Sequence, residues 1–248
     1  MYVQSDAGIA NELSDFFSFF VPGYKFMPAY RNKVWDGKIR LFNAQSRELP
    51  VGLFSYLKEF AKPRNYSVEV EHDAYYGRPD STNDVDLKDL VSYIEALNLT
   101  SKGNKIAPRE YQLEAIVEGI HRKRSILLSP TGSGKSLIIY ILMRWLLEKT
   151  NKKVLIIVPT TSLVQQMFSD FADYSQIDNE WDVESECHRI YSGKPKVNMS
   201  QRVFISTWQS VYKLPGAWFE QFGTVFGDEC HGFKSKSLTA IMNKSREA

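Results

Sequence analysis

The most informative segment of the sequence contains two glycines, Ser129-Pro-Thr-Gly-Ser-Gly-Lys-Ser136. The apolar run that precedes it, 124–129, is typical of a strand, and the run 137–147 that follows has the apolar spacing of a helix. The two glycines therefore lie at a turn from a strand into a helix. This is the context in which a Gly-x-Gly-Lys-Ser segment binds phosphate, although Ser129 stands where the strict motif has glycine.

Each residue type in this loop has a chemical reason to be there. Gly132 and Gly134 let backbone N–H groups approach phosphates without a Cβ in the way, and the helix N-terminus adds positive potential. Lys135 is expected to reach the β- and γ-phosphates of ATP, and the Ser136 hydroxyl to ligate Mg²⁺. The predicted ATP-binding loop consists of Thr131, Gly132, Ser133, Gly134, Lys135 and Ser136.

Two adjacent carboxylates close a second apolar run, Thr224-Val-Phe-Gly-Asp-Glu-Cys-His231. Parallel-sheet proteins bind ligands at the carboxyl ends of their strands, which is where this pair is expected to lie. Asp228 is expected to hold Mg²⁺ through water, and Glu229 to orient and deprotonate an attacking water. The predicted catalytic residues are therefore Lys135, Asp228 and Glu229. A general base for water favours hydrolysis of ATP over phosphate transfer by a small-molecule kinase.

Around these motifs, short apolar runs alternate with helical patterns. The predicted strands are 125–129, 154–158, 203–206 and 224–228, and the predicted helices are 109–122, 135–149, 161–174 and 208–222. Strands that read as continuous apolar runs are buried on both faces, which is typical of a parallel sheet covered by helices. We expect an α/β domain with a mainly parallel sheet.

A polar segment, 98–108, separates this region from a stretch of different character. We place the domain boundary there, which gives a small α+β domain over 1–100 and an ATP-binding domain over 101–248. In the first domain the predicted helices are 7–19, 51–61 and 85–97, and the predicted strands are 38–42 and 67–71.

The charge distribution of the first domain is uneven. Residues 24–66 contain nine Lys or Arg residues against three acidic ones, whereas 67–100 contain two against eight. Within 24–42, basic residues alternate with aromatic ones, and Asp36-Gly37 is a hairpin signal. Basic residues can neutralise phosphates while aromatic rings stack on bases or wedge at a junction. The alternative is that Tyr24, Phe26, Trp35 and Phe42 form a core with solvated lysines around it.

Composition favours a soluble protein. The apolar runs are far shorter than the roughly 20 residues that span a bilayer, and no secretory leader opens the chain. The two cysteines, Cys187 and Cys230, form no disulfide framework, which fits a reducing cytoplasm. We expect a cytoplasmic protein, in the host cytoplasm if a phage encodes it, with no membrane partner.

The order of these motifs resembles that of superfamily 2 helicases, and Asp228-Glu-Cys-His231 resembles their DExH signature. The segment 108–112 resembles the element in which a glutamine recognises adenine, so the resemblance implies ATP-binding roles for Gln112 and Arg109. Segments 158–166 and 205–210 resemble motifs that touch the nucleic-acid backbone. The resemblance implies a RecA-like fold, nucleic-acid contacts at Thr160, Thr207 and Gln209, and motif coupling by His231.

Further segments resemble the recombination and repair helicases of T4-like phages, namely 15–19, 35–41, 155–161 and 218–223. The resemblance implies ATP-dependent branch migration and unwinding of branched or duplex DNA, or of RNA–DNA hybrids. It also implies that the amino-terminal domain binds nucleic acid. The residues expected to contact the duplex backbone are Arg31, Lys33, Lys38 and Arg40.

A complete motor of this family has a second RecA-like domain, for which these 248 residues have no room. We therefore expect a fragment that binds ATP and DNA but hydrolyses ATP slowly, because a catalytic arginine of the missing domain is absent. Three other functions stay open, one of which is the small-molecule kinase named above. A DNA translocase subunit of a restriction system shares every motor motif, and a non-enzymatic DNA-binding module would show no effect of nucleotide.

Overall fold

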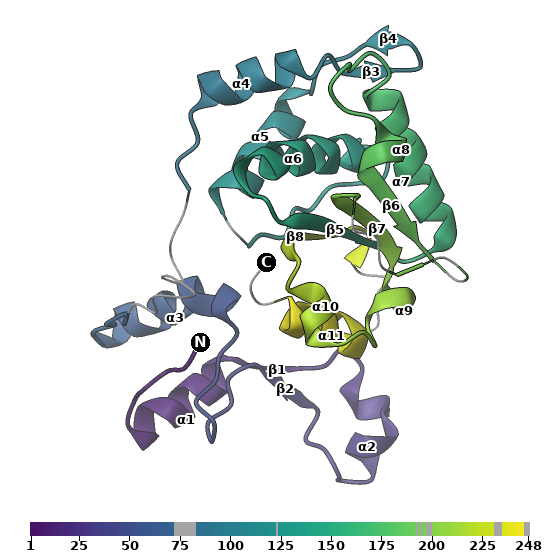
Figure 1. Ribbon diagram of the computed structural model, residues 1–248. Coiled ribbons are helices and arrows are strands. Elements are labelled where there is room, and N and C mark those ends of the chain that lie inside the picture. The colour runs from purple at the N-terminus through teal and green to yellow at the C-terminus, as the bar shows by residue number, and fades with distance from the viewer. Residues whose placement is uncertain are drawn as a thin grey trace. The chain divides into compact units, whose positions relative to one another are not determined.

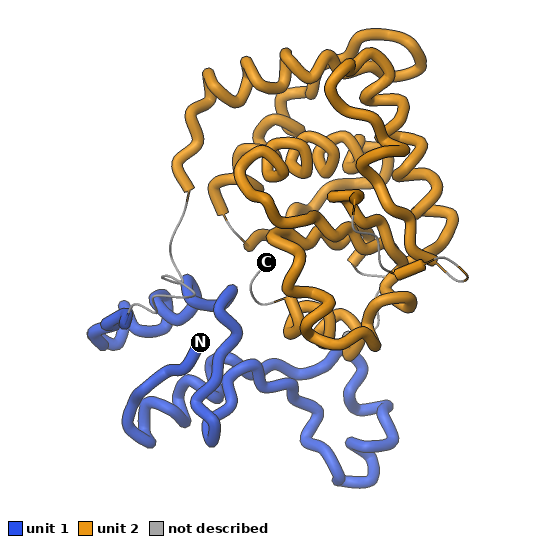
Figure 2. The backbone as a smooth tube through the Cα atoms, viewed as in Figure 1, with its two compact units in different colours: residues 1–82 blue, residues 83–248 orange. Residues whose placement is uncertain are grey.

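The computed structural model describes residues 1–71, 83–122, 124–191, 193, 195–196, 200–230 and 235–245 of the chain. The chain divides into two compact units, unit 1 over residues 1–82 and unit 2 over residues 83–248 (Figure 2). No helix in the described ranges is both long enough and apolar enough to cross a membrane.

Unit 1 combines a short antiparallel hairpin with helices. Its elements are α1 (Ala7–Phe16), β1 (Ser18–Phe20), η1 (Tyr24–Phe26), α2 (Pro28–Arg31), β2 (Lys38–Arg40), η2 (Val51–Leu53), α3 (Phe54–Ala61) and η3 (Lys62–Arg64) (Figure 1). Asp6 caps α1 by accepting a hydrogen bond from the Ile9 N–H at 2.8 Å. Leu13, Phe42 and Phe60 fill its core, each only 1% exposed. The α+β character predicted for this region is confirmed.

Unit 2 contains a parallel sheet in the order β6-β7-β5-β8. The strands are β5 (Lys153–Val158), β6 (Cys187–Ile190), β7 (Val203–Thr207) and β8 (Phe222–Gly227). Residues 154–158 are wholly buried because β5 has a strand on each side and helices on both faces. The predicted α/β domain with a parallel sheet is confirmed.

Helices cover both faces of this sheet (Figure 1). Val154 and Ile156 face a core that includes residues of α4 (Leu87–Ala96), α5 (Glu110–His121), α6 (Lys135–Lys149), α7 (Thr161–Tyr174) and α8 (Val183–Glu186). Leu155 and Ile157 face the opposite core, which includes residues of α9 (Trp208–Val211), α10 (Gly216–Phe219) and α11 (Ser235–Lys244). Alternation along β5 thus supplies both cores, as a strand's period of two requires.

The first elements of unit 2 come from the segment assigned by sequence to the amino-terminal domain. Leu90 and Ile94 of α4 lie in the same core as α5 and α6. The hairpin of β3 (Thr100–Ser101) and β4 (Asn104–Lys105) is attached to α7, because Asp173 accepts hydrogen bonds from the Ser101 hydroxyl and the Lys102 N–H. The division between units at residues 82 and 83 therefore differs from the boundary predicted near residue 100.

Several predicted elements are corrected by the structure. Segments 67–71 and 125–129 are irregular rather than strands, and Ile126 and Leu128 are 89% and 95% exposed. An apolar run favours burial but does not specify a partner strand, and a strand exists only through pairing. The predicted helix 208–222 is divided into α9 and α10, because Pro215 cannot donate the hydrogen bond that a continuous helix needs there.

Candidate functional site

Three neighbouring strands of unit 2 carry the predicted segments 158–166 and 205–210 and the acidic pair to one edge of the sheet. β7, β5 and β8 are parallel, with Val158 opposite Thr207 and Ile157 opposite Gly227. The Asp228 N–H continues the ladder by donating to the Ile157 carbonyl at 2.9 Å. The loops that follow the three strands therefore leave the sheet at the same edge, where ligands of open α/β sheets bind.

The predicted phosphate loop has the backbone that its glycines permit. Gly132 and Gly134 have φ angles of 80° and 78°, in the region that other residues enter at a cost of about 1–2 kcal/mol. A Cβ on Gly134 would lie 2.4 Å from the Gln112 Nε2, so that position also lacks space for a side chain. Gly134 directly precedes α6, whose first N–H groups have no partner within the helix and can donate to an anion.

The serines and the threonine of the loop have different surroundings. Ser133 is 8% exposed, and its hydroxyl contacts the Ser129 hydroxyl and donates to the Pro130 carbonyl at 2.7 Å. Thr131 is exposed to solvent. Gly132 and Thr131 are thus at the accessible side of the loop, while Ser133 holds the loop together from inside.

Gln112 connects the first helix of the motif series to this loop. Its side chain is 5% exposed, accepts from the Arg109 N–H at 2.9 Å and donates to the Ser133 carbonyl at 2.8 Å. The Tyr111 hydroxyl donates to the same carbonyl at 2.8 Å. Gln112 is therefore positioned against the loop backbone, whereas the Arg109 side chain is exposed.

The two predicted charges of the reaction form an ion pair. The Lys135 ammonium donates to the Glu229 carboxylate across 94 residues of sequence, and the two side chains are 26% and 27% exposed. Glu229 has a φ of 49°, left-handed backbone that is strained for a residue other than glycine. Lys135 and Glu229 thus compensate each other's charge at the end of β8.

Asp228, next to Glu229, is half-buried. Burial raises the pKa of its carboxyl, the Glu229 N–H bond at 3.0 Å lowers it, and the charges of Glu229 and Lys135 act in opposite directions. The Asp228 carboxylate and the Ser136 hydroxyl are the hard oxygen donors that Mg²⁺ prefers. The donor set and the glycine-lined loop therefore fit a magnesium nucleotide.

Sequence reasoning missed three residues around this site. The Tyr174 hydroxyl lies 2.9 Å from the Ser136 hydroxyl, and Asp170 also hydrogen-bonds to Ser136. Burial raises the pKa of Asp170. Together with Tyr111, they surround the loop from α5 and α7. The spacing of four residues between Asp170 and Tyr174 was the available signal, because it places both on one face of a helix.

The predicted nucleic-acid residues of unit 2 occupy two neighbouring loops. Thr160 caps α7 by accepting from the Leu163 N–H at 3.3 Å. Thr207 is 6% exposed, and its hydroxyl lies 2.9 Å from that of Ser210. Gln209 is exposed and donates to the Pro159 carbonyl at 3.3 Å, which joins the two loops. His231 lies outside the described residues.

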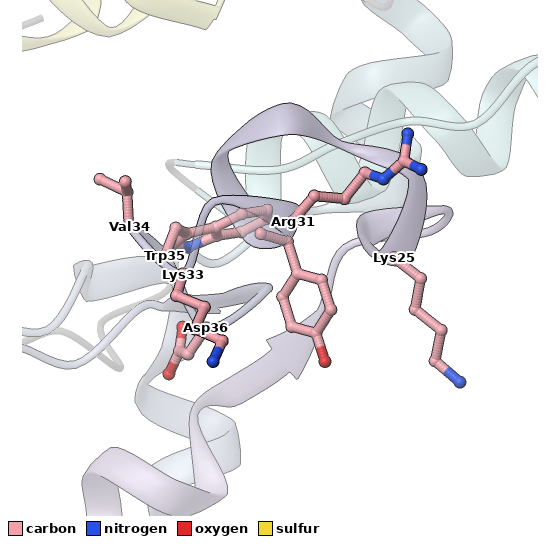
Figure 3. Close-up of a pocket in the computed structure, with 7 residues that line it drawn as sticks. Lys25, Arg31, Lys33, Val34, Trp35 and Asp36 are labelled. Carbon is pink, nitrogen blue, oxygen red and sulfur yellow. The ribbon is translucent and has the colours of Figure 1, made fainter.

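The predicted basic residues of unit 1 lie on α2, just after it, and on β2. Arg40 is paired with Asp36, whose pKa this partner and the Lys38 N–H lower to about 2. Lys38 lies over the Phe20 ring, 5.1 Å from its centroid. Arg31 and Lys33 border a pocket of about 510 Å³ (Figure 3).

The aromatic residues of this region do not form the core that the alternative interpretation required. Phe42 is buried at 1% exposure, but Phe26 is 84% exposed. Tyr24 and Trp35 are half-buried. Aromatic surface therefore accompanies the basic residues on the outside of unit 1.

Comparison with known proteins places both units. A family model described as "Type III restriction enzyme, res subunit" matches residues 105–248, and one described as "DNA helicase UvsW, N-terminal" matches residues 1–71. The chain is 37% identical over 236 residues to the ATP-dependent DNA helicase uvsW of Enterobacteria phage T4, which covers 94% of this chain and 45% of that protein. It thus spans about half the length of this curated relative.

Two solved structures of the bacteriophage T4 UvsW helicase agree with this. They match 99% of this chain with TM-scores of 0.83 and 0.84 at 35% and 36% identity, and the match covers 84% and 48% of those chains. A four-stranded parallel sheet with the motifs at its carboxyl edge is thus accompanied by similarity along nearly all of the sequence. The chain belongs to the type III restriction enzyme res-subunit family through residues 105–248 and is UvsW-like.

Proposed function

We propose that this chain is the ATP-binding part of an ATP-dependent DNA helicase that acts on branched DNA in recombination and repair. The observation that carries the proposal is the ion pair between Lys135 and Glu229, which lies next to Asp228 at the end of β8. The T4 relative is named an ATP-dependent DNA helicase, which supports this activity. Branched or duplex DNA, or an RNA–DNA hybrid, is the proposed partner, and the cytoplasm the proposed location.

In this proposal each residue has a definite task. The N–H groups of Gly132 and Gly134 and the Lys135 ammonium bind the phosphates of ATP. Ser136 and, through water, Asp228 hold Mg²⁺, which neutralises charge on the β- and γ-phosphates when bound. The Glu229 carboxylate accepts the proton of the attacking water. Gln112 and Arg109 bind adenine, and His231 couples the motifs.

The ion pair implies a definite first step. Lys135 must exchange the Glu229 carboxylate for a phosphate oxygen when nucleotide binds, and the released carboxylate is then available as a base. A second RecA-like domain of the same protein is proposed to complete the site with an arginine.

The test is hydrolysis of ATP by the chain extended through its second domain, with and without forked DNA. We expect forked DNA to stimulate hydrolysis, and Lys135→Ala to abolish the stimulation. The chain of 248 residues should bind ATP and hydrolyse it slowly. Hydrolysis that does not change with Lys135→Ala would contradict the proposal.

A translocase subunit of a restriction system is the second candidate, because the res-subunit model matches residues 105–248. The two functions differ in substrate. Stimulation by branched DNA above that by linear duplex of equal length supports the helicase, whereas equal stimulation supports the translocase. DNA binding that is independent of nucleotide in every variant would leave only a DNA-binding module.

A further inference from the structure

A pocket in unit 1 joins exposed cations to aromatic rings within one short segment. It has a volume of about 510 Å³ and is lined by side chains from η1, α2 and the loop before β2 (Figure 3). Lys25 and Arg31 extend on one side of it, and Lys33, Trp35 and Asp36 lie on the other. The volume is within the range of pockets that bind small organic groups, roughly 300–1,000 Å³.

The cations of this pocket are open to a ligand. Arg31 and Lys33 form no ion pair or side-chain hydrogen bond within the described part of unit 1. The one carboxylate at the pocket, Asp36, is already paired with Arg40. An anion that enters therefore meets the uncompensated positive charges of Arg31 and Lys33 rather than a neutral surface.

The aromatic walls are held in place before any ligand binds. The Trp35 Nε1–H donates to the Lys38 carbonyl at 2.8 Å, which fixes the indole against β2. The Tyr30 ring meets the Tyr24 ring edge to face at 4.8 Å, and Tyr24 stacks on Phe20 at 4.6 Å. A planar group that stacks on these rings therefore causes little loss of side-chain entropy.

Lys33 occupies a backbone position that normally belongs to glycine. The Val34 N–H donates to the Ala29 carbonyl at 2.9 Å, the bond that closes a Schellman motif at the end of α2. The left-handed residue of that motif is Lys33, with a φ of 56°. Glycine would fit there without strain. Lys33 thus places a positive charge at the rim of the pocket at some cost in backbone strain.

We propose that this pocket binds one unpaired nucleotide of a DNA branch, with the base against Trp35 and Tyr30 and the flanking phosphates on Arg31 and Lys33. This inference rests on the proposed function, since it specifies the DNA element that unit 1 recognises. Both halves of a nucleotide are matched, because rings bind the π-face of any base and the cations bind phosphate. Duplex DNA offers no free base and uses only the cations.

The experiment compares the affinity of the whole chain for two DNAs by fluorescence anisotropy without ATP. One DNA is a fork with a single-stranded arm, and the other a blunt duplex of equal length. Trp35→Leu should weaken binding to the fork roughly 5-fold or more and leave the duplex unchanged, while Trp35→Phe keeps a ring and most of the affinity. Lys33→Gly should lower the salt dependence of fork binding by about 0.7 in log–log slope.

Two matched variants control for charge and backbone. Lys62→Gln removes an exposed cation of η3 outside the pocket, and Asn65→Gly releases left-handed backbone with a φ of 55° without a change of charge. Both should bind the fork as the unaltered chain does. If Lys62→Gln weakens fork binding as much as Lys33→Gly does, the cations of unit 1 act diffusely and the pocket proposal fails.

The remaining outcomes are equally decisive. Equal losses on fork and duplex with Trp35→Leu, or no loss on either, overturn the nucleotide pocket. Displacement of the fork by polyglutamate as effective as by an oligonucleotide would assign the pocket to an acidic peptide and overturn it too. If the unaltered chain binds neither DNA, the proposed helicase function itself fails; if it binds both and Trp35→Leu has no effect, only the pocket does.

Discussion

The nucleotide site of unit 2 and the pocket of unit 1 differ in how the charges of their cations are compensated. In unit 2, Lys135 of the site is paired with Glu229, and the buried Arg144 outside the site is paired with Asp178. In unit 1, Arg31 and Lys33 are unpaired within the described residues. A paired cation must exchange its partner before it binds an anion, whereas an unpaired one binds directly and releases counterions. If the proposed function holds, binding is coupled to rearrangement in unit 2 and to salt concentration in unit 1.

The largest expected effect breaks the pair at the nucleotide site. Glu229→Gln should lower the ATP hydrolysis rate of the extended chain by about 10²–10⁴, the usual contribution of a general base. It should leave ATP affinity equal or higher, since Lys135 no longer has to leave a carboxylate. Steady-state hydrolysis and binding of a fluorescent ATP analogue measure the two effects.

Lys135→Ala is the matched control, because it opens the same pair from the other side. This variant should lose ATP affinity as well as hydrolysis. If both variants lose affinity equally, Glu229 binds the nucleotide rather than competing with it. The contrast between paired and unpaired cations would then not extend to this site.

The second pair of unit 2 has a structural role. The side chains of Arg144 and Asp178 are 10% and 9% exposed, and the guanidinium lies 2.7 Å from the carboxylate. Arg144 also donates to the Tyr140 hydroxyl at 2.7 Å. Asp178→Ala leaves the guanidinium buried without its carboxylate and should destabilise unit 2 by about 3–5 kcal/mol. Urea unfolding measures this loss.

The comparison variant for that pair is Glu118→Ala, which removes an exposed ion pair of α5 with Arg122. It should destabilise unit 2 by less than about 1 kcal/mol, because solvent screens an exposed pair. If Asp178→Ala and Glu118→Ala lower the free energy of unfolding of unit 2 equally, burial does not increase the contribution of Asp178 to stability.

Local motifs could be predicted from the sequence, whereas contacts between distant segments could not. The chemistry of the loop 129–136 and of the acidic pair is indicated by residue types at fixed spacing after apolar runs. Parallel strands then bring the acidic pair and the loops after β5 and β7 to one edge, whereas the loop 129–136 follows a segment that is not a strand. The pairing of Lys135 with Glu229 across 94 residues, and the approach of Tyr174 to Ser136, depend on how α6, α7 and β8 pack. No local pattern encodes that packing.

Failures of prediction have related causes. The segment 98–108 is polar and contains Gly103, yet it forms a hairpin bound by Asp173 rather than a linker. The run at 126–128 is apolar but exposed. The polar composition of 98–108 indicated flexibility, but the contact with Asp173 orders this segment. The apolar composition of 126–128 indicated a buried strand, but no strand among the described residues pairs with it.

The next effect tests the aromatic wall of unit 1. Gly37 has a φ of 82°, and a Cβ there would lie 2.2 Å from the Tyr24 ring. Gly37→Ala should therefore combine backbone strain with displacement of Tyr24 and destabilise unit 1 by about 2–3 kcal/mol. Thermal unfolding measures the loss, and fork binding should weaken with it.

Gly23→Ala separates the two causes. Gly23 has a φ of 73° but no atom within 4 Å of the added Cβ. It should cost only the strain, about 1 kcal/mol, and leave Tyr24 in place. Equal losses from the two alanine variants would remove the evidence that Gly37 positions the aromatic wall.

The smallest effect has the opposite sign. Lys33→Gly removes a left-handed strain of about 1–2 kcal/mol but adds glycine's greater freedom in the unfolded chain, about 0.5–1 kcal/mol. Unit 1 should therefore become more stable by about 0.5–1 kcal/mol, a rise of roughly 2–8 °C in its thermal midpoint. Asn65→Gly should give a smaller gain, because asparagine tolerates this backbone better. If Lys33→Gly raises the stability of unit 1 and lowers its affinity for the fork, the side chain contributes to DNA binding and not to stability. A residue with a purely structural role would not show these opposite changes.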